Sequence, residues 1–513
     1  MKARLSFLPR NIFPALTIEK PLTVMAKREK MNAEPMPSAS GKHATSLGGN
    51  GAFVQVSVFR RGGQDSTNRK IFRAAVTIGV LSTVAKGGVV LKDLMVAHTF
   101  GRSDALDAFL VAFLLPSFVL ALVMSSLGSA LIPVLVEIKQ KRGPEAEQKV
   151  LSSMMFLSLS ALIVIAMLLG VFAPFYLHIL GSNFSLDKLL LTRKILYCLL
   201  PFIVFGGLST FVSGVLSAYK KFALPALVPI ITPLVTIVAI MLASRAWSVF
   251  TLAIGVVAGG FLEAAILVRL LKKCGMRFLL RWNGLDPDVR SVLQQYAPVL
   301  AGSLLMCSTT VIDQAMAAML PSGSVAALSY ANKIVNLIIA VGATALTTAA
   351  LPYFSHMVAE HDWDGCRHTL MRYTSLTFAA AVPLTLLLIA FSHSLIRLIF
   401  QRGAFQAADT DLVSRVQMCY FIQIPFYMCG MLFVRFLSSI RRNDVLMYGS
   451  AISLVLDISL NLVLMRKMGI AGIALSTSLV YLVAFVILGT VSLRLLFQRQ
   501  SDAAIALGAG IAR

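Results

Sequence analysis

Lysine and aspartate side chains occur inside long apolar stretches of the sequence, where a charge is costly. Lys86, Lys92 and Asp93 lie in the stretch STVAKGGVVLKDLMVAH, and Lys333 lies in a second stretch far along the chain. A charged residue at the centre of a membrane helix costs roughly 2.5–3.5 kcal/mol on insertion scales, so such residues normally face a protein interior or an aqueous cavity. Lysines from two parts of the chain therefore predict a partly cationic cavity, suited to an anionic solute such as a diphosphate.

The spacing of the lysines agrees with this prediction but leaves an alternative open. Lys86 and Lys92 are six residues apart, which places them within roughly 120° of each other around a helix. Alternatively, Lys92 only neutralises Asp93 or Asp107 and extends toward the membrane surface. Glu263 is another acid inside an apolar stretch, and the sequence assigns it no role.

A second polar set, Asp313, Asp457 and Asn461, carries oxygen atoms. Asp457 and Asn461 are four residues apart and share one face of a helix. Such hard oxygen ligands suit a small cation. A polar clamp between helices explains the same residues equally well.

Motifs of catalysis and metal binding are missing from the sequence. It contains no GxSxG, no Walker A pattern and no metal-spaced histidine pair. The six cysteines show no paired spacing, so we predict no disulfide framework, metal site or cofactor. Because there is no ATP site, any transport is predicted to use an ion gradient, the membrane potential or the substrate gradient.

The elements that position these residues are membrane helices. Of 513 residues, 57% are hydrophobic and 13% are charged, and the mean hydropathy is +0.81, which excludes a soluble protein. Apolar stretches follow one another from about residue 71 to residue 497, each near the roughly 20 residues that a spanning helix needs. They do not alternate in polarity as barrel strands do. We therefore predict an all-α polytopic membrane protein.

About twelve spans are predicted along the chain. Their approximate limits are 72–98, 104–136, 150–180, 188–219, 223–244, 247–273, 291–320, 323–357, 368–399, 405–440, 444–466 and 469–497. Loops after even-numbered spans hold most of the Lys and Arg residues, so the positive-inside rule places both termini in the cytoplasm. The net charge of +23 is then a topology signal, and we predict no nucleic-acid partner.

An internal repeat divides the spans into two halves. Three pairs of segments recur at an offset of about 220 residues: 129–135 with 348–354, 172–180 with 391–399, and 216–225 with 437–446. Chance similarity between apolar segments is the alternative, but the common order and offset favour duplication of a six-span unit. Because six is even, both halves keep the same orientation, which predicts two pseudo-symmetric six-helix lobes.

The predicted organisation follows from the repeat and the composition. The parts are a basic disordered cytoplasmic tail at 1–70, an N-terminal lobe at 71–273, a cytoplasmic amphipathic linker at 274–290, a C-terminal lobe at 291–499 and a cytoplasmic tail at 500–513.

The run LKDLMVAHTFGRSDALDAFLVAFLLPS, followed by SALIPVLVEIK, resembles the signature of the lipid II flippase family (MurJ/MviN). This family belongs to the multidrug/oligosaccharidyl-lipid/polysaccharide (MOP) exporter superfamily. PSGSVAALSYANKIVNL and RGAFQAADT are also similar, and the resemblance covers about residues 75–497. It implies a MOP exporter fold whose two lobes alternate in access. The implied activity is flipping an undecaprenyl-diphosphate-linked saccharide, lipid II, across the bacterial cytoplasmic (inner) membrane for peptidoglycan synthesis.

The resemblance also implies roles for individual residues. The family's basic positions in the first span fall on Lys86 and Lys92, its second-span aspartate falls on Asp107, and its eighth-span arginine falls on Lys333. These four are the predicted substrate-binding residues. Lysine keeps the charge of arginine but lacks its planar fork.

The family also suggests coupling to Na⁺ or H⁺ through acids of the second lobe. The residues that would form this cation site are Asp313, Asp457, Asn461 and Thr477. The implied partners are the lipid-linked saccharide and membrane lipids; no oligomeric state is predicted.

Some positions depart from the family pattern. Leu120, Ala121 and SSLGS replace an arginine pair and an AEGA-like stretch, and Asn336 replaces an acid. The chain also ends after span 12, two helices earlier than typical members. A flippase for another polyprenyl-linked glycan, such as an exopolysaccharide repeat, and a drug or metabolite exporter of the same superfamily therefore remain alternatives. We predict a transporter; a membrane glycosyltransferase would need an acidic site on an outer loop.

Overall fold

The computed structural model describes residues 62–511, apart from 220, 222, 275–279, 283 and 285. Most of the predicted tail at 1–70 lies outside the described residues. The first helix begins at Gly62, inside the segment predicted as a tail.

The described residues form helices and no strands, which confirms the predicted all-α fold. The helices are α1 (Gly62–Phe100), α2 (Asp104–Val171), α3 (Ala173–Leu180), α4 (Leu186–Ala218), α5 (Ala223–Leu227), a 3₁₀ turn (Val228–Ile230), α6 (Ile231–Trp247), α7 (Phe250–Lys273), α8 (Pro287–Ala318), α9 (Ser324–Ala359), α10 (Trp363–Ala390), α11 (Ser392–Phe400), α12 (Ala407–Phe421), α13 (Gln423–Ser439), α14 (Asn443–Met468) and α15 (Ile470–Ile511).

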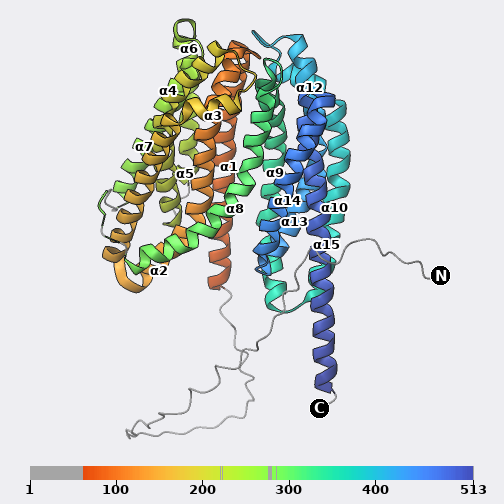
Figure 1. The fold of residues 1–513 in the computed structure, drawn as a ribbon. Helices are drawn as coiled ribbons and strands as arrows, with labels where there is room; N and C mark the ends of the chain where they lie inside the picture. Colours follow the sequence, from red (N-terminus) through yellow and green to blue (C-terminus); the bar gives the residue numbers. More distant parts are fainter. Residues whose placement is uncertain are drawn as a thin grey trace, which may run out of the picture. The chain divides into compact units, whose positions relative to one another are not determined.

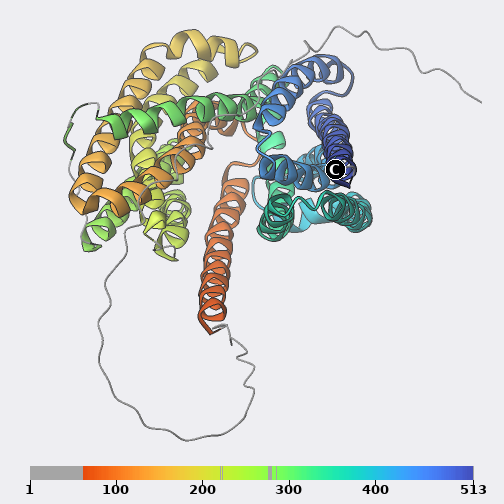
Figure 2. The same ribbon diagram turned by 90° about the horizontal axis from the view of Figure 1, so that it is seen from below.

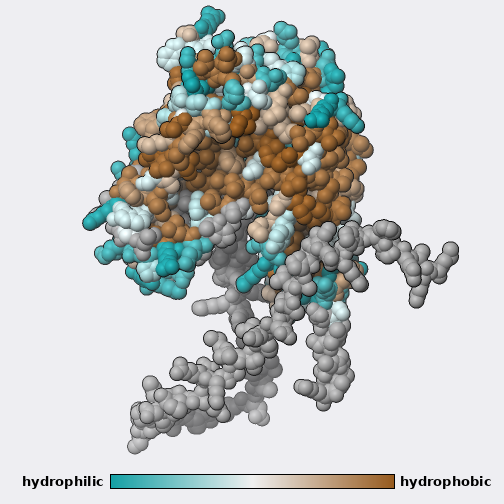
Figure 3. All heavy atoms as spheres, viewed as in Figure 1, coloured by the Kyte–Doolittle hydropathy of each residue, from teal (hydrophilic) through white to brown (hydrophobic). Residues whose placement is uncertain are grey.

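Ten segments of the described chain are long and apolar enough to cross a membrane. They are Asp104–Val123, Lys141–Val171, Leu186–Ala218, Ala223–Trp247, Phe250–Lys273, Ser324–Gly342, Trp363–Ala390, Ala407–Ser439, Asn443–Met468 and Ile470–Ser501. The two other predicted spans, 72–98 and 291–320, fall on α1 and α8, which are 39 and 32 residues long. On the face drawn in Figure 3, apolar side chains cover the middle of the helices and polar side chains gather at their ends, as a lipid environment requires.

Some predicted spans are joined in the structure and others are interrupted. Gly143, between the predicted spans 104–136 and 150–180, has φ 83° and ψ −179°, so α2 contains both spans joined at a kink. Phe172 ends α2 and makes α3 a separate helix, although we predicted one span over 150–180. Likewise, Phe391 separates α10 from α11. The segment predicted as a tail at 500–513 continues α15 up to Ile511.

The helices form two groups, seen in Figures 1 and 2 as α2–α7 in orange to yellow-green and α9–α15 in teal to blue. Helix α8 crosses between them, because it packs against α2 and also against α14. At its start, Val289 and Val292 are buried in a cluster with Leu135 and Leu151 of α2. The sequence limits of the two lobes remain a prediction, but α8 clearly serves both groups.

Candidate functional site

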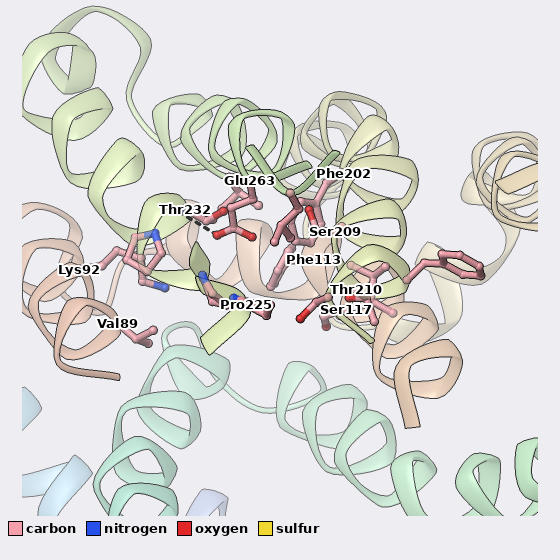
Figure 4. A pocket seen from close by; sticks show the side chains of 18 of the residues that line it. Val89, Lys92, Phe113, Ser117, Phe202, Ser209, Thr210, Pro225, Thr232 and Glu263 are labelled. Carbon is pink, nitrogen blue, oxygen red and sulfur yellow. Dashed lines mark hydrogen bonds between the residues drawn. The ribbon is translucent and has the colours of Figure 1, made fainter. Parts of the chain in front are cut away.

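A cavity of about 760 Å³ opens among α1, α2, α4, α6 and α7, and reaches α8 and α9 (Figure 4). Much of its wall is apolar, with Phe109, Phe113, Leu120 and Phe202 among the lining side chains. Polar groups occupy a few positions between them. This combination suits a ligand with a polar head group that fits partly against apolar surface.

Two lysines, one on α1 and one on α9, meet at this cavity. The Asp93 carboxylate oxygen Oδ1 lies 3.1 Å from Nζ of Lys92 on α1 and 2.8 Å from Nζ of Lys333 on α9. The Asp93 side chain is 7% exposed, whereas Lys92 and Lys333 are 27% and 31% exposed and both line the cavity. Two positive charges share one buried negative charge, so the group keeps a net positive charge toward the cavity.

From the sequence, Lys92 could have served only to neutralise a neighbouring acid such as Asp93, without lining a cavity. The structure shows that pairing and cavity lining occur together, since one carboxylate cannot neutralise both lysines. Lys333 also lies over the ring of Tyr330, with 5.2 Å between Nζ and the ring centroid. Tyr330 is fixed in turn by donating its hydroxyl to the carbonyl oxygen of Gly101, at 3.0 Å.

Lys86 is not brought to this group. Its side chain is exposed on α1, and it is not among the described residues that line the cavity. The six-residue spacing placed Lys86 and Lys92 on one broad face, but only Lys92 lies where α1 meets α9.

Asp107 lies at the contact between α2 and the start of α9. It is 1% exposed, and its carboxylate accepts hydrogen bonds from the backbone nitrogens of Gly323 at 2.7 Å and Ala326 at 2.8 Å. Lys188 of α4 forms an ion pair with the same carboxylate at 3.3 Å. Asp107 therefore caps the N-terminus of α9 across the two helix groups, away from the described lining of the cavity.

Further contacts join the two helix groups at this end of the molecule. Arg102 donates to Asp409 at 2.9 Å, and the backbone nitrogen of Ala404 donates to the carbonyl oxygen of His98 at 2.8 Å. Gly101 has φ +53°, and a Cβ there would lie 2.4 Å from the carbonyl oxygen of Ala404. Glycine is therefore required where the loops of the two groups meet.

Glu263 is a cavity residue to which the sequence gave no role. It lies on α7, and its Oε1 accepts a hydrogen bond from the backbone nitrogen of Thr232, at 3.1 Å (Figure 4). Thr232 is at the start of α6, where backbone N–H groups lack helical partners. The signal in the sequence was an acid inside an apolar span, but only the fold shows which space it faces.

The four predicted cation-site residues come together between α8, α14 and α15. Asn461 donates Nδ2 to Oδ1 of Asp313 at 2.8 Å, and Thr477 donates its hydroxyl to Oδ2 of Asp313 at 3.2 Å. The carboxyl groups of Asp313 and Asp457 are also in contact. Asp313, Asp457 and Asn461 are 7%, 1% and 0% exposed.

Two buried oxygens of this set have no hydrogen-bond partner among the described residues, namely Oδ2 of Asp457 and Oδ1 of Asn461. Buried polar atoms are nearly always paired, and two adjacent carboxylates repel each other unless a cation or proton lies with them. The donor set therefore fits a small hard cation, and a proton shared between the two carboxyl groups would also satisfy it.

Comparison with known proteins gives a consistent result. The family model described as "Lipid II flippase MurJ" matches residues 96–507. A probable lipid II flippase MurJ of Rickettsia prowazekii is 23% identical over 416 residues, which cover 80% of this chain and 81% of the relative. The lipid II flippase MurJ of Burkholderia cenocepacia is 28% identical over 362 residues, covering 68% and 70%.

Solved structures with the same fold include a lipid II flippase MurJ in an inward closed conformation. Its TM-score is 0.72 at 22% identity, with 85% of this chain and 92% of that chain covered. An inward-facing multidrug resistance MATE family transporter of the MOP superfamily follows with a TM-score of 0.69 at 14% identity, covering 83% and 99%. The predicted MOP exporter fold is thereby confirmed.

Proposed function

The chain belongs to the lipid II flippase MurJ family, and from this premise we propose that it flips lipid II across the cytoplasmic membrane by alternating access. It is a multi-pass membrane transporter. The observation that carries the proposal is the contact of Lys92 and Lys333 with a single carboxylate at the cavity wall. A lipid-linked diphosphate is an anion that two adjacent ammonium groups can hold, and an apolar wall suits its lipid part.

The binding residues in this proposal are Lys92 and Lys333. Asp93 is a positioning residue, since it holds the two lysine side chains together across α1 and α9. We propose that Asp107 does not bind the substrate, because both of its carboxylate oxygens already interact with α9 and Lys188. Its role is to hold the outer ends of the helix groups together.

Alternating access requires that the end closed by Asp107 can open. The contacts at that end include hydrogen bonds and ion pairs between loops and helix ends, with Arg102 and Asp409 as one pair. Apolar side chains of both groups, such as Leu106 and Phe405, also share one buried cluster, so opening must separate apolar as well as polar contacts. We propose that the structure represents the state with the outer end closed and the cavity serving the cytoplasmic side.

The second lobe supplies the proposed coupling site. The residues that would hold Na⁺ are Asp313, Asp457, Asn461 and Thr477. Alternatively, a proton shared between the two carboxyl groups would couple transport to H⁺. Support comes from the unpaired oxygens of Asp457 and Asn461. Because α8 carries Asp313 and also packs against α2, occupancy of this site can influence both helix groups.

Complementation of a strain depleted of its own lipid II flippase tests the proposal. We expect the wild-type chain to restore growth and Lys333→Ala to fail at equal membrane abundance. Lys467→Ala, which removes an exposed lysine at the end of α14, should restore growth like the wild type. Failure of the wild-type chain, together with loss of an exported glycan when the gene is deleted in its own host, would instead support a flippase for another polyprenyl-linked saccharide.

A further inference from the structure

The wall of the cavity around Glu263 contains an unusual group of oxygen atoms. Oε1 of Glu263 accepts a hydrogen bond from the backbone nitrogen of Thr232 at 3.1 Å, and the side chain of Thr232 also lies against this carboxylate. The hydroxyls of Ser209 and Thr232 are buried, line the same cavity and lack hydrogen-bond partners in the described structure. Figure 4 shows Glu263 and Thr232 beside one another, with Ser209 farther along the same wall, beyond Phe113.

Packing between α6 and α7 fixes the Glu263 carboxylate in this position. A Cβ at Gly259 would lie 2.5 Å from Cα of Thr232, so the two helices are in backbone contact one turn from Glu263. The bonded oxygen is stabilised as a charged carboxylate by the N-terminal end of α6. Capping of α6 accounts for this oxygen alone. It explains neither the second carboxylate oxygen nor the two hydroxyls.

The chemistry of the three groups selects a ligand. One carboxylate oxygen and two hydroxyl oxygens provide three acceptors, and a primary ammonium group has three N–H donors and no acceptor. An anionic ligand is excluded because the negative charge of Glu263 would repel it. We propose that Glu263, Ser209 and Thr232 form a subsite for a primary ammonium group of the transported molecule, separate from the lysines that hold its anionic group.

This inference rests on the proposed function and deepens it, because it makes the cavity selective for a zwitterionic head group. Lys92 and Lys333 bind the anionic part, while Glu263 on α7 binds the cationic part. A ligand that bridges the two would be oriented within the cavity, which a positive patch alone cannot achieve. A charge-assisted hydrogen bond of this kind is expected to change affinity about tenfold.

Binding by the purified full chain in nanodiscs tests the subsite. The probes are lipid II with a lysine in its peptide and the same lipid II with norleucine, which lacks only the ammonium group. We expect the wild type to bind the lysine form about tenfold more tightly, and Glu263→Gln to bind both forms equally. The glutamine keeps an oxygen for Thr232, so the start of α6 stays capped.

The matched control is Glu360→Gln, which removes an exposed acid beyond the end of α9 and should keep the tenfold preference. Equal binding of the two probes by the wild type, or an unchanged preference in Glu263→Gln, overturns the subsite while lipid II binding stands. Absence of binding to either probe by the wild type overturns the proposed function itself, and the subsite with it. Ser209→Ala should lower the preference several-fold without removing it.

Discussion

Asp93 of α1 and Lys333 of α9 form an ion pair of 2.8 Å that joins these two helices at the wall of the cavity. The same carboxylate oxygen lies 3.1 Å from Lys92, so three charges depend on one another. This relationship makes the charge balance of the site testable by single and double substitutions.

Asp93→Asn should destabilise the protein. The substitution leaves Lys92 and Lys333 close together without a counter-charge, and breaking a buried ion pair costs about 3–5 kcal/mol. Thermal unfolding in detergent should show a clear decrease in Tm. The double substitution Asp93→Asn with Lys333→Met should recover much of it, because one positive charge is removed together with the negative one.

Asp411→Asn serves as the control for that experiment, since the Asp411 side chain is exposed and pairs with His393 at the surface. It should leave Tm nearly unchanged. A double variant no more stable than Asp93→Asn alone would contradict the coupling between Asp93 and Lys333.

Asp107→Asn should loosen the outer end. The amide keeps one acceptor oxygen for α9 but loses the ion pair with Lys188 and one of its two acceptor oxygens. The closed state then loses stability relative to the open state. We expect a cysteine placed at Ser329 in the cavity, with the native cysteines replaced, to react several-fold faster with a membrane-impermeant thiol reagent added outside.

Asp104→Asn is the matched control at the same end. Asp104 also contacts Lys188, but its side chain is 64% exposed, so a smaller increase in labelling is expected. Equal labelling of Ser329→Cys with and without Asp107→Asn would show that Asp107 does not hold the end closed.

The sequence predicted more about the helices than about the sites. Apolar stretches located the spans because their length is set by the membrane, and the polar set of Asp313, Asp457 and Asn461 came together as predicted. The six-residue spacing could not show which of Lys86 and Lys92 lies at the cavity, because both fit one broad face of the helix. Only the position of α9 beside α1 shows that it is Lys92. Asp107 could not be recognised as a cap of α9, since its partners Gly323 and Ala326 are more than 200 residues away.

Some helix breaks had a signal in the sequence that our spans did not use, such as Pro174 at the start of α3, whereas others had none. The end of α10 at Phe391 has no proline or glycine to mark it, and Pro383 lies inside the helix instead. Tertiary packing decides such breaks, because neighbouring helices supply contacts that offset the lost backbone hydrogen bonds. The predicted span 405–440 is different: it divides into α12 and α13 where Pro425 removes a hydrogen bond to the carbonyl of Phe421, which is a signal in the sequence.

Gly259→Ala should destabilise the N-terminal helix group. The added methyl would lie 2.5 Å from Cα of Thr232, a backbone atom that cannot rotate away, so α6 and α7 must separate. Overpacking of this kind costs about 1–3 kcal/mol. Gly430→Ala on α13 is the control, because nothing lies within 4 Å of its added carbon. Unfolding in detergent should show a decrease in Tm for the first variant and no decrease for the second.

Sodium should stabilise the protein through Asp457. If the buried oxygens of Asp457 and Asn461 bind Na⁺, then Na⁺ at about 100 times its Kd adds about 2.7 kcal/mol to the folded state. We expect Tm to rise when Na⁺ replaces a large organic cation at constant ionic strength. Asp457→Asn should remove this rise, whereas Asp444→Asn, an exposed acid paired with Arg442 on the same helix, should keep it. An identical rise in both variants would place the effect elsewhere, and a stability that depends on pH but not on Na⁺ would favour a proton between Asp313 and Asp457.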